Sequence, residues 1–177
     1  LGGICHINHP GRYYGGSNTI GTNGEDAANN PANIKKYVDL FMKYEACVGM
    51  EIINKLDGDS YSDRILWDNI LKETMPEGRF VWGFSNDDTH SNEATGHSFN
   101  MMLMPANNPV EVRKAMENGA FYASAHVAKR EGYTITDHSI INDYQPPVIT
   151  NIAVDQNEDT ITIEGDLYNT IEWIADG

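Results

Sequence analysis

The segment VGMEIIN, residues 48–54, decides the fold class. Its side chains are apolar at almost every position, which is typical of a strand that is buried on both faces. A helical pattern precedes the segment, beginning at Asn30 and Pro31, and a second helical pattern follows it from Ser62. The first helix has a well-marked start, because Asn caps helices and Pro fits the first helical turn. This alternation of helix and buried strand indicates an α/β fold.

The same patterns predict further elements along the chain. Strands are expected at residues 2–8, 79–84, 98–104 and 121–124. A third helix begins at Asn108, where Glu111 completes a capping box, and ends at Gly119. The Gly- and Asn-rich residues 11–29 are expected to form a long loop. The order of the elements predicts a layered fold whose strands are buried and mostly parallel.

The composition changes at Gln145-Pro146-Pro147, which predicts a domain boundary. With 177 residues, the chain can hold one compact domain at residues 1–145 and a small β appendage at residues 146–177. Partly alternating segments predict antiparallel strands in the appendage at residues 148–154, 160–164 and 170–175. We expect the appendage to stop before its last strand and the chain to be a fragment, since it also lacks an initiator Met.

Charge and composition exclude several classes of partner. The net charge of −14 argues against a nucleic acid, because binding to a phosphate backbone needs clustered Lys and Arg. No apolar run approaches the ~20 residues that span a bilayer, so no membrane segment is expected. Two cysteines are too few for a disulfide framework. The compartment stays open: we expect a soluble protein, either cytoplasmic or secreted after processing of a missing N-terminus.

The segment NDDTH, residues 86–90, is the strongest chemical signal. It follows an expected strand, and in α/β folds binding sites gather beyond the carboxyl ends of strands. In extended backbone, Asp88 and His90 would present a carboxylate and an imidazole to one point. That donor pair suits Zn, Mn or Fe. The alternative is an Asp-rich turn with an exposed His.

A second signal is the segment INHPGR, residues 7–12. His9 ends an apolar strand at Pro10, which cannot continue the pairing of strands, so His9 is either a metal ligand or a structural residue. Arg12 could bind a phosphate or carboxylate through two parallel hydrogen bonds. Glu51 is an acid inside a buried strand and therefore needs a metal, a cation or backbone donors. His97, at the head of another strand, is either a substrate contact or an ordinary loop residue.

Taken together, these stretches resemble the PHP family (polymerase and histidinol phosphatase) of metal-dependent phosphoesterases. The resemblance covers nearly the whole chain, and the HP and DxH elements are specific in combination. The segments that carry it are INHPGR (7–12), VGMEIIN (48–54), LWDNIL (66–71), VWGFSNDDTH (81–90) and GAFYAS (119–124).

The resemblance implies a distorted barrel of seven β/α units, of which this chain looks like the C-terminal half followed by a small antiparallel β segment. It implies that His9, Asp88 and His90 are ligands of divalent metal ions, with Glu51 and Asp87 behind them. The family opens with a His-x-His strand and further ligands that are missing here. By itself, the chain is therefore expected to bind metal weakly and to catalyse little.

The function expected for the intact protein is metal-assisted hydrolysis of a phosphoester in a small substrate. The metals would polarise the phosphoryl oxygen and lower the pKa of a bound water, while Arg12 or His97 neutralises charge on the phosphate. Two alternatives stay open. One is amidohydrolase-type hydrolysis at the same metal site, and the other is a non-catalytic binding or structural module whose β appendage docks a partner. The oligomeric state is also open.

Overall fold

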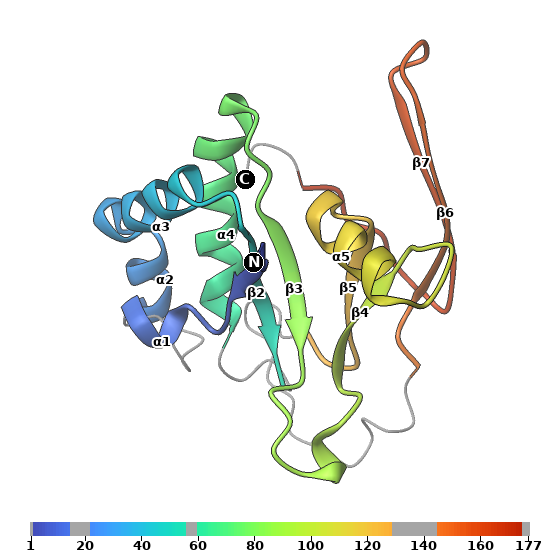
Figure 1. The fold of residues 1–177 in the computed structure, drawn as a ribbon, viewed down its shortest axis with the longest axis horizontal. Coiled ribbons are helices and arrows are strands. Elements are labelled where there is room, and N and C mark those ends of the chain that lie inside the picture. Colours follow the sequence, from blue (N-terminus) through green and yellow to red (C-terminus); the bar gives the residue numbers. More distant parts are fainter. Residues whose placement is uncertain (1, 15–21, 56–59, 129–144, 175–177) are drawn as a thin grey trace.

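The computed structural model describes residues 2–14, 22–55, 60–128 and 145–174 (Figure 1). Its strands are β1 (Cys5–Ile7), β2 (Cys47–Asn54), β3 (Trp82–Asn86), β4 (Ser98–Met102), β5 (Phe121–Ala125), β6 (Val148–Asp155) and β7 (Thr160–Asp166). Its helices are α1 (Gly11–Tyr14), α2 (Thr22–Ala28), α3 (Pro31–Lys43), α4 (Tyr61–Thr74) and α5 (Pro109–Asn118), with two 3-10 turns, η1 (Met75–Glu77) and η2 (Asn92–Ala94).

The centre of the fold is a parallel sheet in the order β1-β2-β3. Every residue of β2 is buried, as its continuous apolar sequence predicts. One face of the sheet is covered by α3 and α4, while β4, β5 and α5 lie on the side of β3 away from these helices (Figure 1). Gly49 is required in β2, because a Cβ atom there would lie 2.1 Å from the carbonyl oxygen of Trp82 on β3.

The hydrophobic core lies between this sheet and its helices. Phe41 of α3, Met50 of β2, and Leu66 and Ile70 of α4 are all fully buried and belong to one cluster. The start of α3 is as predicted, with the side chain of Asn30 accepting the Ala32 N–H at 2.9 Å. Burial of four large apolar side chains at one interface is what fixes the helices on the sheet.

The expectation of a PHP-type barrel half is wrong. The described strands form three separate sheets: β1-β2-β3 is parallel, whereas β4-β5 and β6-β7 are antiparallel pairs, and no barrel closes within the described residues. The expectation of mostly parallel strands fails at β4 for a visible reason. The side chain of Asn100 on β4 hydrogen-bonds to both backbone groups of Ser85 on β3. It accepts the Ser85 N–H at 2.9 Å and donates to the Ser85 carbonyl at 2.8 Å. A side chain therefore stands where a fourth parallel strand would continue the ladder.

The expected loop at residues 11–29 is also wrong in part. Within it, α1 and α2 are helical, and residues 15–21 lie outside the described residues. Ala28 of α2 is fully buried, and Asn69 of α4 donates to its carbonyl at 3.3 Å. Packing against α4 thus overrides the weak helix propensity of a Gly- and Asn-rich segment.

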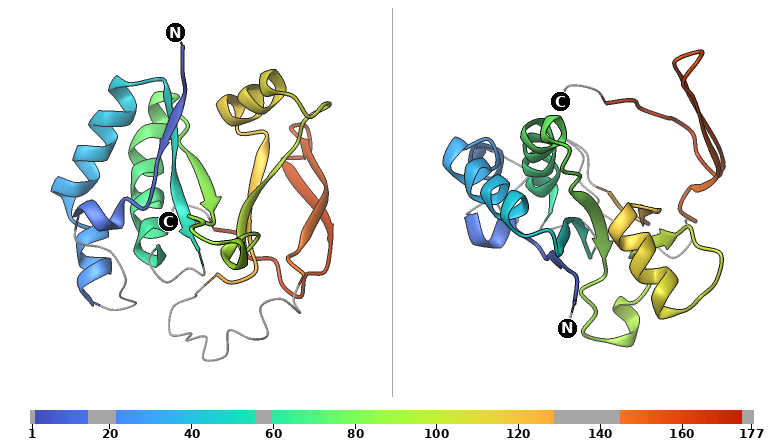
Figure 2. Two further views of the ribbon diagram at one scale, coloured as in Figure 1. Left: turned by 60° about the horizontal axis from the view of Figure 1, so that its bottom comes forward. Right: turned by 45° about the horizontal axis from the view of Figure 1, so that its top comes forward.

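The third helix and the hairpin follow the sequence closely. Asn108 caps α5 by accepting the N–H groups of Val110 and Glu111, and Gly119 ends the helix in the left-handed region with φ 65°. The β6–β7 pair is antiparallel as predicted, but residues 167–174 form no strand, so the expected third strand is wrong in that part. The hairpin stands apart from the helical layer (Figure 2). Among the described residues, no helix is long and apolar enough to cross a bilayer.

Candidate functional site

Three unusual backbone conformations meet where β1, β2 and β3 end. His9, Lys55 and Asp88 follow these strands, and they have φ angles of 31°, 54° and 47°. Because the strands are parallel neighbours, all three turns lie at the same edge of the sheet, which we call the carboxyl edge. A positive φ is uncommon for residues other than glycine, and it costs of order 1–3 kcal/mol per residue. Strain gathered at one edge is typical of a functional site.

Glu51 links the three strand ends at the carboxyl edge through hydrogen bonds. Its side chain is 1% exposed, and it accepts the backbone N–H of His9. Its second oxygen accepts the side-chain amides of Asn54 at 3.1 Å and Asn86 at 3.0 Å. One buried carboxylate thus receives a donor from the end of each of the three strands. These donors stabilise the buried charge and fix the exits of the strands.

Asp88 and His90 lie close together, although not in the extended geometry that the sequence predicts. Asp88 is left-handed, and His90 Nδ1 lies 2.6 Å from its backbone oxygen and 3.8 Å from its carboxylate Oδ1. The other carboxylate oxygen lies 3.0 Å from Nζ of Lys55. The pKa of Asp88 is lowered, first by the hydrogen bond from Lys55 and then by the charges of Lys55, His90 and His9. The charge of His9 therefore acts on the same carboxylate.

Two imidazole nitrogens in β1 and the turn after it are buried. Among the described residues, Nδ1 of His9 and Nδ1 of His6 are buried without a hydrogen-bond partner. The ring of His6 stacks on Phe84 with 4.4 Å between the ring centres. Burial lowers the pKa of His6, and the charge of Glu51 opposes this shift. An unpartnered buried imidazole nitrogen is costly unless a ligand takes it, so Nδ1 of His9 fits the role of a metal ligand.

A buried carboxyl group anchors the segment that follows His9. Asp63 of α4 is fully buried, and it accepts the Tyr14 hydroxyl at 2.9 Å. Burial raises the pKa of Asp63 to about 7, and it also raises the pKa of Tyr14. Among the described residues, the second oxygen of Asp63 has no partner. This contact fixes α1, and with it the turn at His9, against α4.

The remaining predicted site residues have other contacts. The carboxylate of Asp87 accepts the backbone N–H of Gly96 and, at 2.7 Å, that of Ser98, so it closes the loop between β3 and β4. Nε2 of His97 lies 3.1 Å from the Glu93 carbonyl oxygen, and its ring centre lies 6.4 Å from that of His126. These contacts place His97 in the loop between β3 and β4. Arg12 is exposed on α1, one turn beyond His9.

Sequence reasoning missed Lys55, Asn54 and Asn86. Asn54 and Lys55 lie at the end of the strand expected at residues 48–54 and directly after it, which is the same signal that selected His9 and Asp88. Asn86 ends β3, two residues beyond the strand expected at residues 79–84. Applying that criterion to residues 48–54 would have found Lys55. The convergence of the two Asn side chains on Glu51 has no local signal, because it depends on the pairing of β2 with β3.

Donor chemistry at the carboxyl edge fits a divalent cation only in part. An unpartnered imidazole of His9, the Asp88 carboxylate and the neighbouring His90 are suitable ligands for Zn, Mn or Fe. In the described part of the chain, however, no three His, Cys, Asp or Glu side chains gather closely enough to hold a metal by themselves. A cation bound here would need water or substrate oxygens as further ligands.

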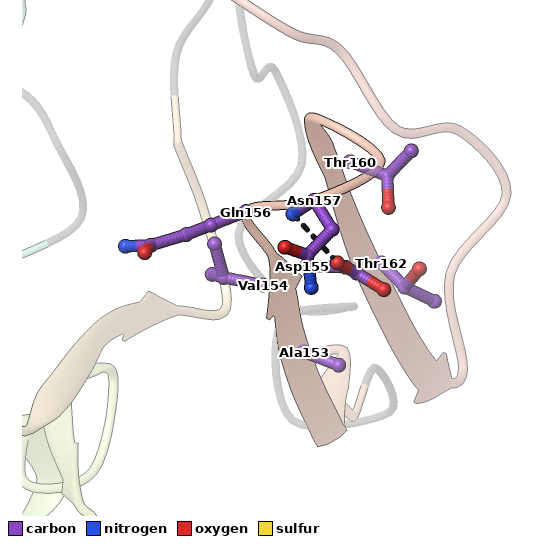
Figure 3. A pocket seen from close by; sticks show the side chains of 7 residues that line it. All are labelled: Ala153, Val154, Asp155, Gln156, Asn157, Thr160 and Thr162. Carbon is purple, nitrogen blue, oxygen red and sulfur yellow. Dashed lines mark hydrogen bonds between the residues drawn. The ribbon is translucent and has the colours of Figure 1, made fainter.

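Two surface hollows lie elsewhere on the molecule. One, of about 480 Å³, is on the turn of the β6–β7 hairpin, where the Asn157 N–H donates to the Asp155 carboxylate at 2.9 Å (Figure 3). The other, of about 360 Å³, is bordered by Phe80, Trp82 and Glu117. Neither hollow includes a residue of the carboxyl edge. The hairpin hollow is open and is explained by an ordinary Asx turn.

Comparison with known proteins adds no constraint: no family model, no curated protein and no solved structure matches the chain.

Proposed function

We propose that the carboxyl edge of β1–β3 binds a divalent metal ion and takes part in hydrolysis of a phosphoester in a small substrate. The observation that carries the proposal is the set of three left-handed turns held by one buried carboxylate, Glu51. Strain of this kind persists only where the surrounding structure fixes it, and it gathers where side chains must be held in place for a ligand. The likeness of the HP and DxH motifs to metal-dependent phosphoesterases supports the reaction class.

Different residues of the chain would bind the metal ion and the phosphate. His9 and Asp88 would hold the metal, with His90 beside them. A bound divalent metal polarises a phosphoryl oxygen and lowers the pKa of a coordinated water. Lys55 already places an ammonium group 3.0 Å from Asp88, where it would attract the phosphate. Arg12, exposed on the neighbouring α1, offers a planar fork of donors for the same anion.

Net charge supports a small substrate over a nucleic acid. The chain carries −14, and in the described residues the basic groups at the carboxyl edge stand among Glu51, Asp87 and Asp88. A polyanion would meet repulsion from the rest of the surface, whereas a single phosphate can be neutralised by a metal ion and one or two basic side chains.

The test is direct titration of the chain with Mn²⁺ by isothermal calorimetry, beside hydrolysis of p-nitrophenyl phosphate. Asp88→Asn and His9→Gln are each expected to weaken Mn²⁺ binding at least tenfold, since each removes a ligand. Asp39→Asn is the matched control, because Asp39 is exposed on α3 and pairs only with the neighbouring Lys35 among the described residues. Equal Mn²⁺ affinity in all four proteins would refute the proposal.

A further inference from the structure

The two cysteines of the chain lie side by side at the other end of the same sheet. Cys5 is the first residue of β1, Cys47 is the first residue of β2, and their Cα atoms are partners in the parallel register. Neighbouring strands are roughly 4.8 Å apart, and the Cα atoms of a disulfide are usually roughly 4.4–6.8 Å apart. The backbone therefore already has the spacing that a disulfide needs.

The two side chains leave the sheet from this paired position. Cys5 is one of the groups that raise the pKa of the Cys47 thiol, as expected for a close neighbour on the adjacent strand. Just after Cys5 the register shifts between Cys5 and His6, and such an irregularity changes the direction of a side chain relative to a regular ladder. The irregularity thus allows the Cys5 side chain to turn toward Cys47, which a regular parallel ladder would not favour.

We propose that Cys5 and Cys47 form a reversible intramolecular disulfide, with a small disulfide such as oxidised glutathione as the oxidant. This inference stands on the strand register, which pairs the two residues directly, and it is independent of the proposed hydrolysis. The bond would lie at the amino ends of β1 and β2, away from the turns at His9 and Lys55.

The difference in exposure between the two thiols determines which of them reacts first with the oxidant. Cys5 is exposed, whereas Cys47 is buried, and burial together with the nearby Cys5 raises the pKa of the Cys47 thiol to about 11. The Cys5 thiolate attacks oxidised glutathione, forms a mixed disulfide and releases one glutathione thiolate. Cys47 then attacks the Cys5 sulfur, and the second glutathione leaves with the proton that Cys47 gives up. Two thiols are oxidised and one glutathione disulfide is reduced to two thiols.

The consequence for the protein is a covalent link between two strands that are distant in the chain. The link closes a loop of roughly 40 residues and so restricts the unfolded chain, which is the usual source of stabilisation by a disulfide. A typical bond of this kind would raise the melting temperature by about 6–12 °C in a chain of this size.

The test is equilibration of the chain in buffers of reduced and oxidised glutathione, followed by acid quenching and intact mass spectrometry. The ratio of the disulfide form to the reduced form, at a known ratio of oxidised to reduced glutathione, gives the effective concentration of one thiol for the other. This value is measured first in native buffer and then in concentrated urea. Because the native fold already holds the thiols together, the native value is expected to be about 100-fold higher. The product should be monomeric and lighter by two hydrogens.

Single variants test the order of the steps. Cys47→Ser should stop at a glutathione adduct on Cys5, and Cys5→Ser should stay reduced, since Cys47 is buried. Circular dichroism of each variant checks that it folds. A native effective concentration no higher than the value in urea would overturn the proposal, as would disulfide-linked dimers or a stable mixed adduct as the only product. Rapid modification of Cys47 in Cys5→Ser would overturn the order.

Discussion

The parallel sheet and the β6–β7 hairpin both contain strands rich in β-branched and other apolar residues, but they differ in how far these side chains are buried. In β2 every residue is buried between helices and neighbouring strands, and the strand ends are held by Glu51. In the hairpin, Ile152 is paired with Ile163 and Val154 with Ile161, so these side chains share one face, and Val154 and Ile161 are more than half exposed. Both regions obey local strand rules, but within the described part of the chain the hairpin leaves Val154 and Ile161 largely exposed.

The two regions also differ in the backbone strain that they can hold. Left-handed residues occur in both regions: Asp159 lies at the hairpin turn with φ 50°, a position that turns commonly require. At the carboxyl edge, three such residues stand on a buried sheet whose packing fixes their conformation. A two-stranded hairpin alone is marginally stable and cannot impose strain of that kind.

The largest expected effect compares the two regions directly. Phe41→Ala should lower the free energy of unfolding by about 3–5 kcal/mol, because it leaves a cavity in the core. Ile161→Ala should change it by less than about 0.5 kcal/mol, because Ile161 is 55% exposed. Urea unfolding followed by circular dichroism measures both. A loss of similar size for Ile161→Ala would show that the apolar hairpin face is covered in solution.

The next largest effect is the pH dependence of the free energy of unfolding that Asp63 causes. Its folded pKa is raised by burial to about 7, above the ordinary value of 3.8, so the folded chain keeps a proton that the unfolded chain loses. The stabilising contribution is complete below pH 3.8 and is lost as the pH rises through 7, by about 2–4 kcal/mol.

The measurement for Asp63 is the difference in unfolding free energy between the wild type and Asp63→Asn across that pH range. The wild type should lose stability relative to the variant as the pH rises. Asp39→Asn, an exposed carboxylate on α3, should show no such trend. A flat difference for Asp63→Asn would place the pKa of Asp63 near its ordinary value.

Glu51→Gln tests how much the buried carboxylate stabilises the carboxyl edge. The variant keeps the shape of the side chain but removes the charge and one acceptor, so one of its three donors loses its partner. The expected loss of stability is about 1.5–3 kcal/mol. Amide hydrogen exchange of His9 should accelerate as its turn loosens. Glu73→Gln, exposed on α4, is the control, and an unchanged exchange rate of His9 in Glu51→Gln would contradict the assigned role.

Lys55→Met gives the smallest effect on stability. The Lys55–Asp88 ion pair is partly exposed, so its loss should cost less than about 1 kcal/mol. The pKa of Asp88 should rise toward its ordinary value, because the hydrogen bond from Lys55 is the main cause of its lowering. A carboxyl-carbon NMR titration of Asp88 measures the change. Lys35→Met, which breaks an exposed pair on α3, should leave the pKa of Asp88 unchanged.

Much of the local structure could be predicted because it depends on neighbours in sequence. The cap at Asn108, the stop at Gly119 and the buried strand at residues 48–54 were each correct within a residue. The positions of His9 and Asp88 beyond strand ends were also predictable. Helix α2 was missed because contact with α4, at Asn69, outweighs a loop-forming composition.

Neighbouring residues are enough to specify which segments form strands and helices and where polar side chains leave the sheet, since caps, turns and apolar periods act over a few residues. Three further features depend on how the strands pack: Asn100 interrupts the sheet at Ser85, Glu51 accepts donors from three strands, and Cys5 is paired with Cys47 in the register. Each of these contacts joins residues from different strands. Their energies depend on register and burial, which no local stretch of the chain contains.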